Sequence, residues 1–203
     1  MQMLVKPMGR GYQTNCYLLT SDDKTIVIDP GIESAEWVIQ NAKNPIAILN
    51  THGHFDHTYD DAPLQQALKI PVYIRSEDSF MLDRDNRDPN REPCKADVCV
   101  SDEELIELEG FRFRFRHFAG HTPGCSMIEF EDRIFSGDFI FDDTIGRYDF
   151  PASSPRDMKR SLERFMSLYA EDHRPLYTGH GKPTDIQSAR KFLPAFIDAL
   201  RFY

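Results

Sequence analysis

The stretch Thr51–His57 of this 203-residue chain reads THGHFDH and places three histidines and an aspartate within six positions. It directly follows Ile46–Asn50 (IAILN), a short apolar run that predicts a buried strand. The polar stretch is therefore expected in a loop at the carboxyl end of that strand. On an extended backbone His52 and His54 point the same way, and the last two residues follow after a turn. The stretch thus predicts two groups of side chains aimed at neighbouring points.

Three later motifs place the same kinds of side chain beside glycine, each after a strand-like run. They are His121 in GHTPG, Asp138 in SGD and His180 in GHG. Glycine permits sharp turns and a close approach of the backbone. Imidazole nitrogens and carboxylate oxygens are ligands that divalent metals accept. Together with Asp56 and His57 these residues predict a metal site. His117 and His173 have no such context and are interpreted as structural or surface residues.

Length and composition restrict the other classes of function. A chain of 203 residues with 40% hydrophobic residues predicts one globular domain over residues 1–203. The formal net charge of −9 argues against a broad nucleic-acid-binding surface. No apolar run approaches the roughly 20 residues of a membrane span, so no membrane association is expected. With no apparent signal peptide and four cysteines, the sequence predicts a cytoplasmic protein with free thiols.

Periodicity predicts an α+β fold in which mixed sheets are covered by helices. Strands are expected at Asn15–Thr20, Thr25–Asp29, Ile46–Asn50, Pro71–Ile74, Phe111–Arg116, and in a hairpin of Ser126–Phe130 with Arg133–Ser136. Helices are expected at Glu33–Ala42, Ala62–Lys69 and Glu77–Leu82, from a Ser154 cap to about Ala170, and after Thr184. Asp83–Lys95 is polar and predicts a surface loop.

Taken in order, HxHxDH, GHTPG, SGD and GHG resemble the metallo-β-lactamase superfamily, and the motifs run from residue 52 to residue 180. The resemblance implies an αββα four-layer sandwich with two metal ions at one edge. It implies that His52, His54 and His121 bind the first ion, that Asp56, His57 and His180 bind the second, and that Asp138 bridges them. Zinc suits these ligands best, and iron or manganese also accept them.

Such a pair of ions predicts hydrolysis. Two ions acting on one water lower its pKa from near 15.7 to about 7, so that a bridging hydroxide exists at neutral pH. We expect this hydroxide to attack a carbonyl carbon while one ion polarises the oxygen. Asp138 would hold the two ions together and Asp56 would also orient the hydroxide. These two aspartates are the predicted catalytic residues.

Local motifs indicate the substrate. TNCYLL (Thr14–Leu19), IDPG (Ile28–Gly31), GHTPG and IGRYDF (Ile145–Phe150) resemble the glyoxalase II group, which hydrolyses S-acylglutathione thioesters. The resemblance implies conversion of S-lactoylglutathione to lactate and glutathione. A thiolate leaves with a pKa near 8.5, so the reaction needs little help from a general acid. A small-molecule thioester is therefore the expected partner.

The resemblance also implies substrate contacts. A basic residue that contacts glutathione in this group falls on Arg147, which would pair with a substrate carboxylate. The alternative for Arg147 is a structural ion pair with Asp143 or Asp149. The group's nearby tyrosine falls on Asp149, and the adjacent Tyr148 is taken as the substrate contact. Only Gly181–Tyr203 follow the last ligand, as in shorter members of the group, so a looser substrate preference is expected.

Several other interpretations stay open. A persulfide dioxygenase with one iron shares most of these motifs, although the full set of seven ligands favours two ions. A phosphodiester hydrolase acting on RNA would need a basic surface, for which the alternating arginines of Phe111–Arg116 are the only candidate. Those arginines otherwise predict the solvated face of a half-buried strand. Cys125, next to GHTPG, is interpreted as a packing residue, with a redox role as the alternative. A non-catalytic binding module is the remaining class.

Overall fold

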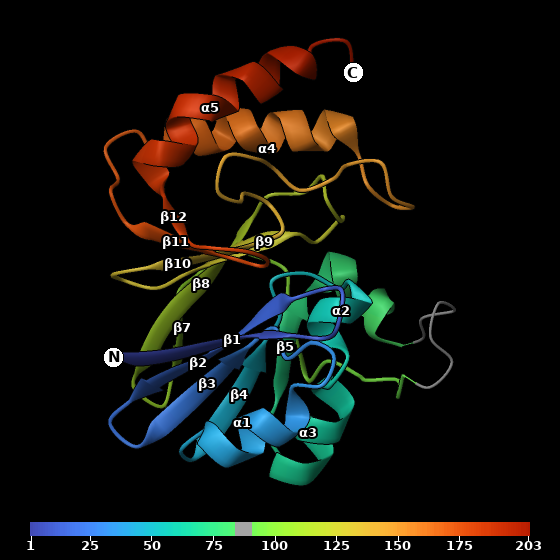
Figure 1. The fold of residues 1–203 in the computed structure, drawn as a ribbon, viewed down its shortest axis with the longest axis vertical. Helices are drawn as coiled ribbons and strands as arrows, with labels where there is room; N and C mark the ends of the chain where they lie inside the picture. The colour runs from blue at the N-terminus through green and yellow to red at the C-terminus, as the bar shows by residue number, and fades with distance from the viewer. Residues whose placement is uncertain (84–90) are drawn as a thin grey trace.

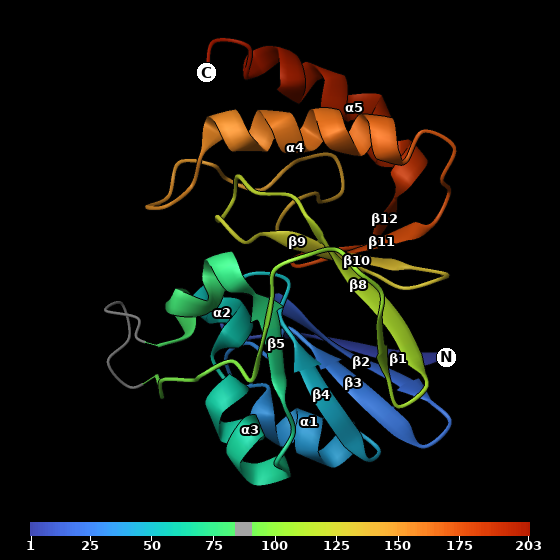
Figure 2. The same cartoon turned by 180° about the vertical axis from the view of Figure 1, so that it is seen from behind.

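The computed structural model describes residues 1–83 and 91–203. Within these residues two six-stranded sheets face one another, and helices cover the outer face of each sheet (Figure 1). The view from behind shows the same four layers, with α1 and α3 on one side and α4 and α5 on the other (Figure 2). The predicted αββα sandwich is therefore confirmed. Part of the predicted loop at Asp83–Lys95, residues 84–90, lies outside the described residues.

The first sheet combines an antiparallel and a parallel half. Its strands, in spatial order, are β1 (Gln2–Met8), β2 (Thr14–Ser21), β3 (Lys24–Ile28), β4 (Pro45–Leu49), β5 (Val72–Arg75) and β6 (Val98–Val100). Strands β1 to β3 are antiparallel, and β3 to β6 are parallel. Parallel neighbours need crossover connections, and these carry α1 (Ala35–Asn41), α2 (Phe55–Thr58) and α3 (Asp61–Leu68). The predicted helices at Glu33–Ala42 and Ala62–Lys69 are thus confirmed to within two residues.

The second sheet is mostly antiparallel. Its strands are β7 (Ile106–Leu108), β8 (Phe111–His117), β9 (Ser126–Glu129), β10 (Ile134–Gly137), β11 (Pro175–Thr178) and β12 (Thr184–Asp185), and only β10 and β11 run parallel. Helix α4 (Pro155–Leu168) connects β10 to β11, and α5 (Ile186–Ala199) follows β12. The Ser154 hydroxyl accepts a hydrogen bond from the Asp157 amide at 3.1 Å, so the predicted cap of α4 is confirmed.

Strand β8 separates two environments. Phe111, Phe113 and Phe115 are at most 2% exposed and fill the space between the sheets. The arginines of the opposite face carry carboxylate partners: Arg116 binds Glu129 at 2.9 Å and Glu103 at 3.1 Å, and Arg112 binds Glu107. The basic charge is therefore already paired, which supports the predicted solvated face over a phosphate-binding strip.

Three further predictions concern the helix at Glu77–Leu82, the cysteines and membrane-spanning segments. The predicted helix at Glu77–Leu82 is a 3₁₀ segment, η1 (Ser76–Leu82). All four cysteines are free thiols, and Cys125 is fully buried in the core beneath α4 and α5, in agreement with a packing role. Burial raises the pKa of the Cys125 thiol, which disfavours the reactive thiolate. Across the two described ranges, no helix has the length and apolarity needed to cross a membrane.

The two sheets are joined at one edge. The Asn15 amide at the start of β2 donates to the Gly179 carbonyl just after β11 at 2.8 Å. The Asn15 side chain donates to the carbonyls of Thr178 and Gly181 at 3.0 and 2.9 Å. Strands β10 and β11 end at this same edge, and so does β4 of the other sheet (Figure 1). All of the motif segments are thereby brought to one place.

Candidate metal centre

The loop after β4 supplies two sets of side chains. His52 and His54 stand before α2, and His54 is the residue that precedes its first turn, with an extended ψ of 142°. The chain then turns into the helix, which carries Asp56 and His57. Because the turn changes the direction of the backbone, the two pairs point to different places, as the sequence predicted. All four side chains are buried.

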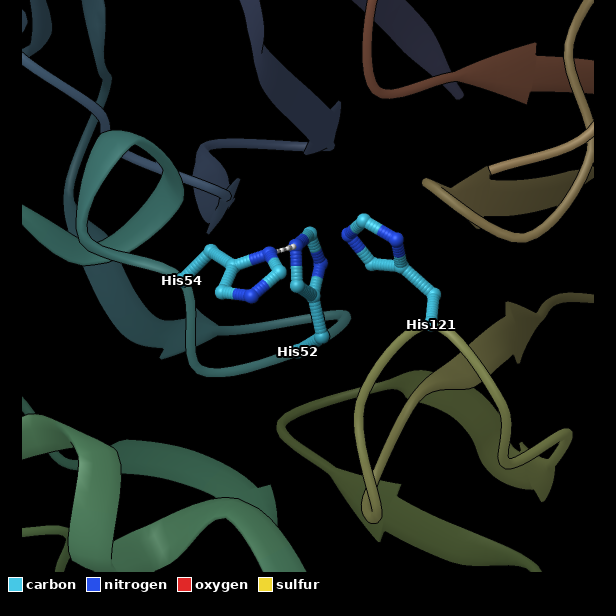
Figure 3. A group of neighbouring side chains, drawn as sticks. All are labelled: His52, His54 and His121. Atoms are coloured by element: carbon cyan, nitrogen blue, oxygen red, sulfur yellow. Dashed lines mark hydrogen bonds between the residues drawn. The ribbon is translucent and has the colours of Figure 1, made fainter. Parts of the chain in front are cut away.

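His52, His54 and His121 form what we call the first group. Figure 3 shows His121 approaching from the loop between β8 and β9 to meet the two histidines of the other sheet. Ligand atoms of the three lie within 4.8 Å of one another, and His52 Nε2 is 3.2 Å from His54 Nδ1. Burial and the neighbouring imidazoles lower the pKa of His52, and burial together with His121 lowers that of His54 to about 3. Neutral rings with converging lone pairs are ligands for a cation.

Asp56, His57 and His180 form the second group, in which ligand atoms again lie within 4.8 Å. The Nε2 atoms of His57 and His180 are 3.2 Å apart, and Asp56 Oδ2 is 3.4 Å from His180 Nε2. Burial lowers the pKa of His180, but Asp138 and Asp56 outweigh this effect and raise it to about 9. The two Nε2 atoms face each other and cannot both carry a proton in the space between them. A dication there would neutralise the carboxylates of Asp56 and Asp138 better than protons do.

Asp138 lies between the two groups. Its Oδ1 is 3.2 Å from His57 Nε2, and its Oδ2 is 3.5 Å from His121 Nε2 and 3.4 Å from His180 Nε2. Burial raises the pKa of this carboxyl, but His57 and His180 outweigh it and hold the pKa well below its usual range. Within the described chain, Asp138 Oδ1 and His121 Nε2 are buried without hydrogen-bond partners. Buried polar atoms that lack a hydrogen-bond partner within a cluster of imidazoles and carboxylates fit divalent metal ions.

Outer hydrogen bonds fix the orientation of four of the rings. On the first sheet, His52 Nδ1 donates to Thr51 Oγ1 at 3.1 Å, and His57 Nδ1 donates to Asp29 Oδ2 at 3.0 Å. On the second sheet, His121 Nδ1 donates to the Arg147 carbonyl at 2.7 Å, and His180 Nδ1 donates to the Tyr12 carbonyl at 3.0 Å. A neutral imidazole that donates through Nδ1 presents the lone pair of Nε2 inward. Sequence reasoning assigned no role to Asp29, although it stands in the IDPG motif.

Two glycines next to the ligands are required by close packing. A Cβ atom at Gly179 would lie 2.1 Å from Asp138 Oδ1 and 2.8 Å from His57 Cε1. A Cβ atom at Gly146 would lie 1.7 Å from the Asp138 carbonyl oxygen. Any larger residue would displace the aspartate between the groups, which explains why glycine flanks these motifs.

A cavity of about 750 Å³ opens beside the two groups. Aromatic rings line it close to the ligands. The ring centroids of Phe150 and His54 are 5.6 Å apart, and those of Phe141 and His180 are 6.0 Å apart. Two cations, Arg147 and Lys182, also line it, and Lys182 was not foreseen from the sequence. The cavity can therefore hold a molecule that has both apolar and anionic parts.

The two predicted substrate contacts differ in position. Arg147 lines the cavity, pairs with Asp149 at 2.9 Å, and stacks over the Phe150 ring at 4.2 Å. Both expectations for this residue are thus compatible with its geometry. Tyr148 is not among the described residues that line the cavity, and instead packs against the apolar core beneath α4 and α5. Its half-buried ring has apolar neighbours there, and substrate contact by Tyr148 stays a prediction.

Comparisons with known proteins agree with this geometry. Residues 9–180 match the family described as the metallo-beta-lactamase superfamily. The chain is 33% identical to the hydroxyacylglutathione hydrolase GloC of Haemophilus influenzae, across 90% of this chain and 92% of that protein. Among solved structures, it superposes on the BLEG-1 B3 metallo-beta-lactamase with a TM-score of 0.85 and 28% identity, over 96% and 99% of the two chains. It superposes on a di-iron-bound form of TTHA1623 with a TM-score of 0.75 and 30% identity, over 95% and 99%.

The family match spans five-sixths of the chain and includes all the motif segments from residue 52 to residue 180. The fold, the clustered histidines and aspartates, and the similar proteins lead to the same assignment. This chain belongs to the metallo-beta-lactamase superfamily.

Proposed function

We propose that this protein is a two-metal thioester hydrolase that acts on S-acylglutathiones, with S-lactoylglutathione as the reference substrate. The observation that carries the proposal is the meeting of two ligand groups at Asp138, beside a cavity that holds two cations. The likeness to GloC supports the substrate class, and the di-iron form of TTHA1623 supports a centre with two ions.

The first and second groups would each hold one divalent ion, zinc by preference and iron or manganese otherwise. When bound, the two ions supply an activated water and polarise the carbonyl of the substrate. Asp138 contacts histidines of both groups and would keep the two ions at a fixed separation. Asp56 accepts a hydrogen bond from the Thr14 hydroxyl at 2.9 Å, which fixes its carboxylate and leaves it set to orient the water.

A thioester suits a site of this composition. The thiolate of glutathione leaves with a pKa near 8.5, so it departs without a proton at neutral pH. Apart from the candidate ligands, Asp142 is the one carboxylate among the described residues lining the cavity, and it is paired with Lys182 at 2.8 Å. The cavity therefore offers no obvious general acid, and the proposed leaving group needs none.

Arg147 and Lys182 would bind the carboxylates of glutathione. Their side chains are 65% and 78% exposed, and each pairs with an aspartate in or beside the cavity. Exposed ion pairs contribute little, in the range of about 0 to 1 kcal/mol, so a substrate carboxylate can take either cation from its present partner. The rings of Phe141 and Phe150, which line the cavity near His180 and His54, would pack on the hydrocarbon of the substrate.

The decisive experiment measures S-lactoylglutathione hydrolysis on protein whose metals are counted in the same sample. We expect two ions per chain and turnover that disappears when the ions are removed. One iron per chain, with oxygen uptake on glutathione persulfide and no thioester hydrolysis, would replace the proposal with a persulfide dioxygenase.

Arg147→Ala tests the glutathione part of the proposal. We expect KM for S-lactoylglutathione to rise about threefold, the loss of about 0.7 kcal/mol for an exposed ion pair, with kcat nearly unchanged. Arg112→Ala is the matched control, since Arg112 is 64% exposed and also holds an exposed carboxylate, but it lies on β8 away from the cavity. Equal kinetics for the two variants would exclude substrate binding by Arg147.

A further inference from the structure

Asp78 lies outside every ligand-bearing segment, and yet it contacts two of them. It belongs to η1, and its side chain is fully buried. Its carboxylate accepts hydrogen bonds from the Gly53 amide at 2.9 Å, the Thr122 hydroxyl at 2.6 Å and the Gly124 amide at 2.5 Å. A buried carboxylate with three donors is held in a single position and holds its donors in return.

The three donors belong to the two loops of the first group. Gly53 stands between His52 and His54, and Thr122 is the residue after His121. The loops also meet where Ser126 donates to the Thr51 carbonyl at 3.0 Å, but that contact lies at the base of the loops, by the strands. The hydrogen bonds of Asp78 join the two loops at Gly53 and Thr122, directly beside the histidines, so Asp78 controls how far His121 stands from the other two.

The glycines of both loops are explained by the approach of η1. A Cβ atom at Gly53 would lie 2.7 Å from Met81 Cβ and 3.0 Å from the Asp78 carbonyl oxygen. A Cβ atom at Gly124 would lie 2.7 Å from Asp78 Cγ. Neither glycine has a positive φ, so it is this close contact, and not the backbone conformation, that requires glycine in HGH and at the end of GHTPG. The three segments form one tightly fitted junction.

We infer that Asp78 is a positioning residue for the first metal group, and that it sets the affinity of that group without affecting the second. The second group is held by other contacts: His57 donates to Asp29, and His180 donates to the Tyr12 carbonyl. The inference rests on the proposed binding of two ions. It adds to that proposal a residue that touches neither ion, and a difference in affinity between the two groups.

Competition with a chelator, followed by metal counting, tests the inference. In Asp78→Asn an amide NH₂ replaces one acceptor oxygen and faces a donor, so at least one of the three bonds is lost. Loss of a residue that orients metal ligands lowers metal affinity by about 10- to 100-fold. We expect that loss for one ion of the two, with the affinity for the other ion within threefold of the wild type.

Backgrounds that retain a single group identify the ion concerned. In a His180→Ala background, where the first group is intact, Asp78→Asn should still weaken the remaining ion. In a His121→Ala background, where the second group is intact, the same change should have no further effect on it. Equal weakening in both backgrounds, or in neither, would overturn the inference. A wild-type chain that binds fewer than two ions would instead refute the proposed two-metal function.

A milder variant and a matched control separate positioning from general damage. Thr122→Val removes one of the three bonds and should weaken the same ion by about 3- to 10-fold, consistent with one hydrogen bond. If Asp78→Asn does not fold, an unchanged affinity in Thr122→Val overturns the inference. Glu103→Gln is the control, because Glu103 also accepts from three groups, Arg116, Arg164 and the His117 amide, outside the ligand loops. It should lower the unfolding temperature of the metal-free protein and leave both affinities unchanged.

Discussion

The two sheets contribute to the centre in different ways. The first sheet supplies four candidate ligands from one short stretch, residues 52–57, which follows β4 and includes the start of α2. The second sheet supplies three, and each comes from a separate connection: His121 follows β8, Asp138 follows β10 and His180 follows β11. The first half of the centre is thus a local structure, and the second half exists only when three strands are aligned in register.

This difference decides what a substitution can disturb. On the first sheet, the turn into α2 positions the side chains, and all four belong to one continuous stretch of chain. On the second sheet, the register of β10 with β11 shifts between Phe135 and Gly137, which brings Asp138 beside Gly179. A small displacement of either strand would separate the ligands. The junction between the halves and the second sheet should therefore be more sensitive than the loop.

The largest effect is expected from Asp138→Ala, which removes the carboxylate that contacts both groups. We expect the loss of at least one ion and a fall in kcat/KM on the order of 10³-fold, about 4 kcal/mol of transition-state stabilisation. Metal counting and thioester hydrolysis measure the two effects. Asp142→Ala removes a nearby carboxylate of the cavity wall and should keep both ions. An Asp138→Ala protein with two ions and full turnover would contradict the bridging role.

Gly179→Ala tests the sensitivity of the second sheet by itself. The new methyl group would lie 2.1 Å from Asp138 Oδ1, so the aspartate must move. Because a displacement of about 1 Å at a reacting centre reduces rates by roughly 10²-fold, kcat/KM should fall by about that factor. Gly181→Ala is the control: its φ of +71° strains the backbone, but nothing lies within 4 Å of the added atom. If both variants retain activity equally, the close approach at Gly179 has no role in the centre.

Thr14→Val disturbs one contact between β2 and the local loop. The Thr14 hydroxyl donates to Asp56 at 2.9 Å, and valine keeps the shape without the donor. The loss of one hydrogen bond to a charged group, about 1.5 kcal/mol, predicts roughly a tenfold lower kcat/KM. Thr20→Val, at the far end of the same strand, removes a hydroxyl pair with Thr25 and should leave kinetics unchanged. A Thr14→Val enzyme as active as the wild type would show that the loop positions Asp56 unaided.

The smallest effect concerns the helix layer of the second sheet and should leave the centre unchanged. Burial raises the pKa of Glu103, but Arg164 and the His117 amide outweigh it and lower the pKa to about 2. Because this is below the ordinary value near 4.5, the ionised Glu103 stabilises the fold above that pH, and the contribution disappears as the pH falls toward 2. Urea unfolding of the metal-free protein measures this contribution from pH 7 to pH 2. The free energy of unfolding should fall less over this range in Glu103→Gln than in the control Glu107→Gln, which affects an exposed pair.

The fold was predictable where sequence patterns reflect burial directly. The alternating phenylalanines and arginines predicted the half-buried strand β8, and the Ser-Pro pair predicted the start of α4; the structure agrees with both. Strand β1 was not predicted, because it is an edge strand with five of its seven residues exposed and with Pro7 inside it. The two-residue β12 is too short to give any periodic signal.

The centre was predictable where chemistry and spacing coincide. Paired histidines and glycine-flanked ligands are rare enough to be recognised, and all seven candidates converge. Asp78 and Lys182 were not recognised, since a single acidic or basic residue in a chain with 33 acidic and 24 basic ones carries no local signal. Their positions depend on contacts between segments distant in sequence: Asp78 meets Gly124 across 46 residues.

The pairing of His57 with His180, 123 residues apart, has a consequence for biosynthesis. During translation the histidine-rich loop leaves the ribosome long before residue 180 has been added. A nascent chain therefore displays half of a chelating site to whichever ions the cell provides, and the other half does not yet exist. The second group can be complete only after residue 180 has been added and His180 has reached its place beside the Tyr12 carbonyl.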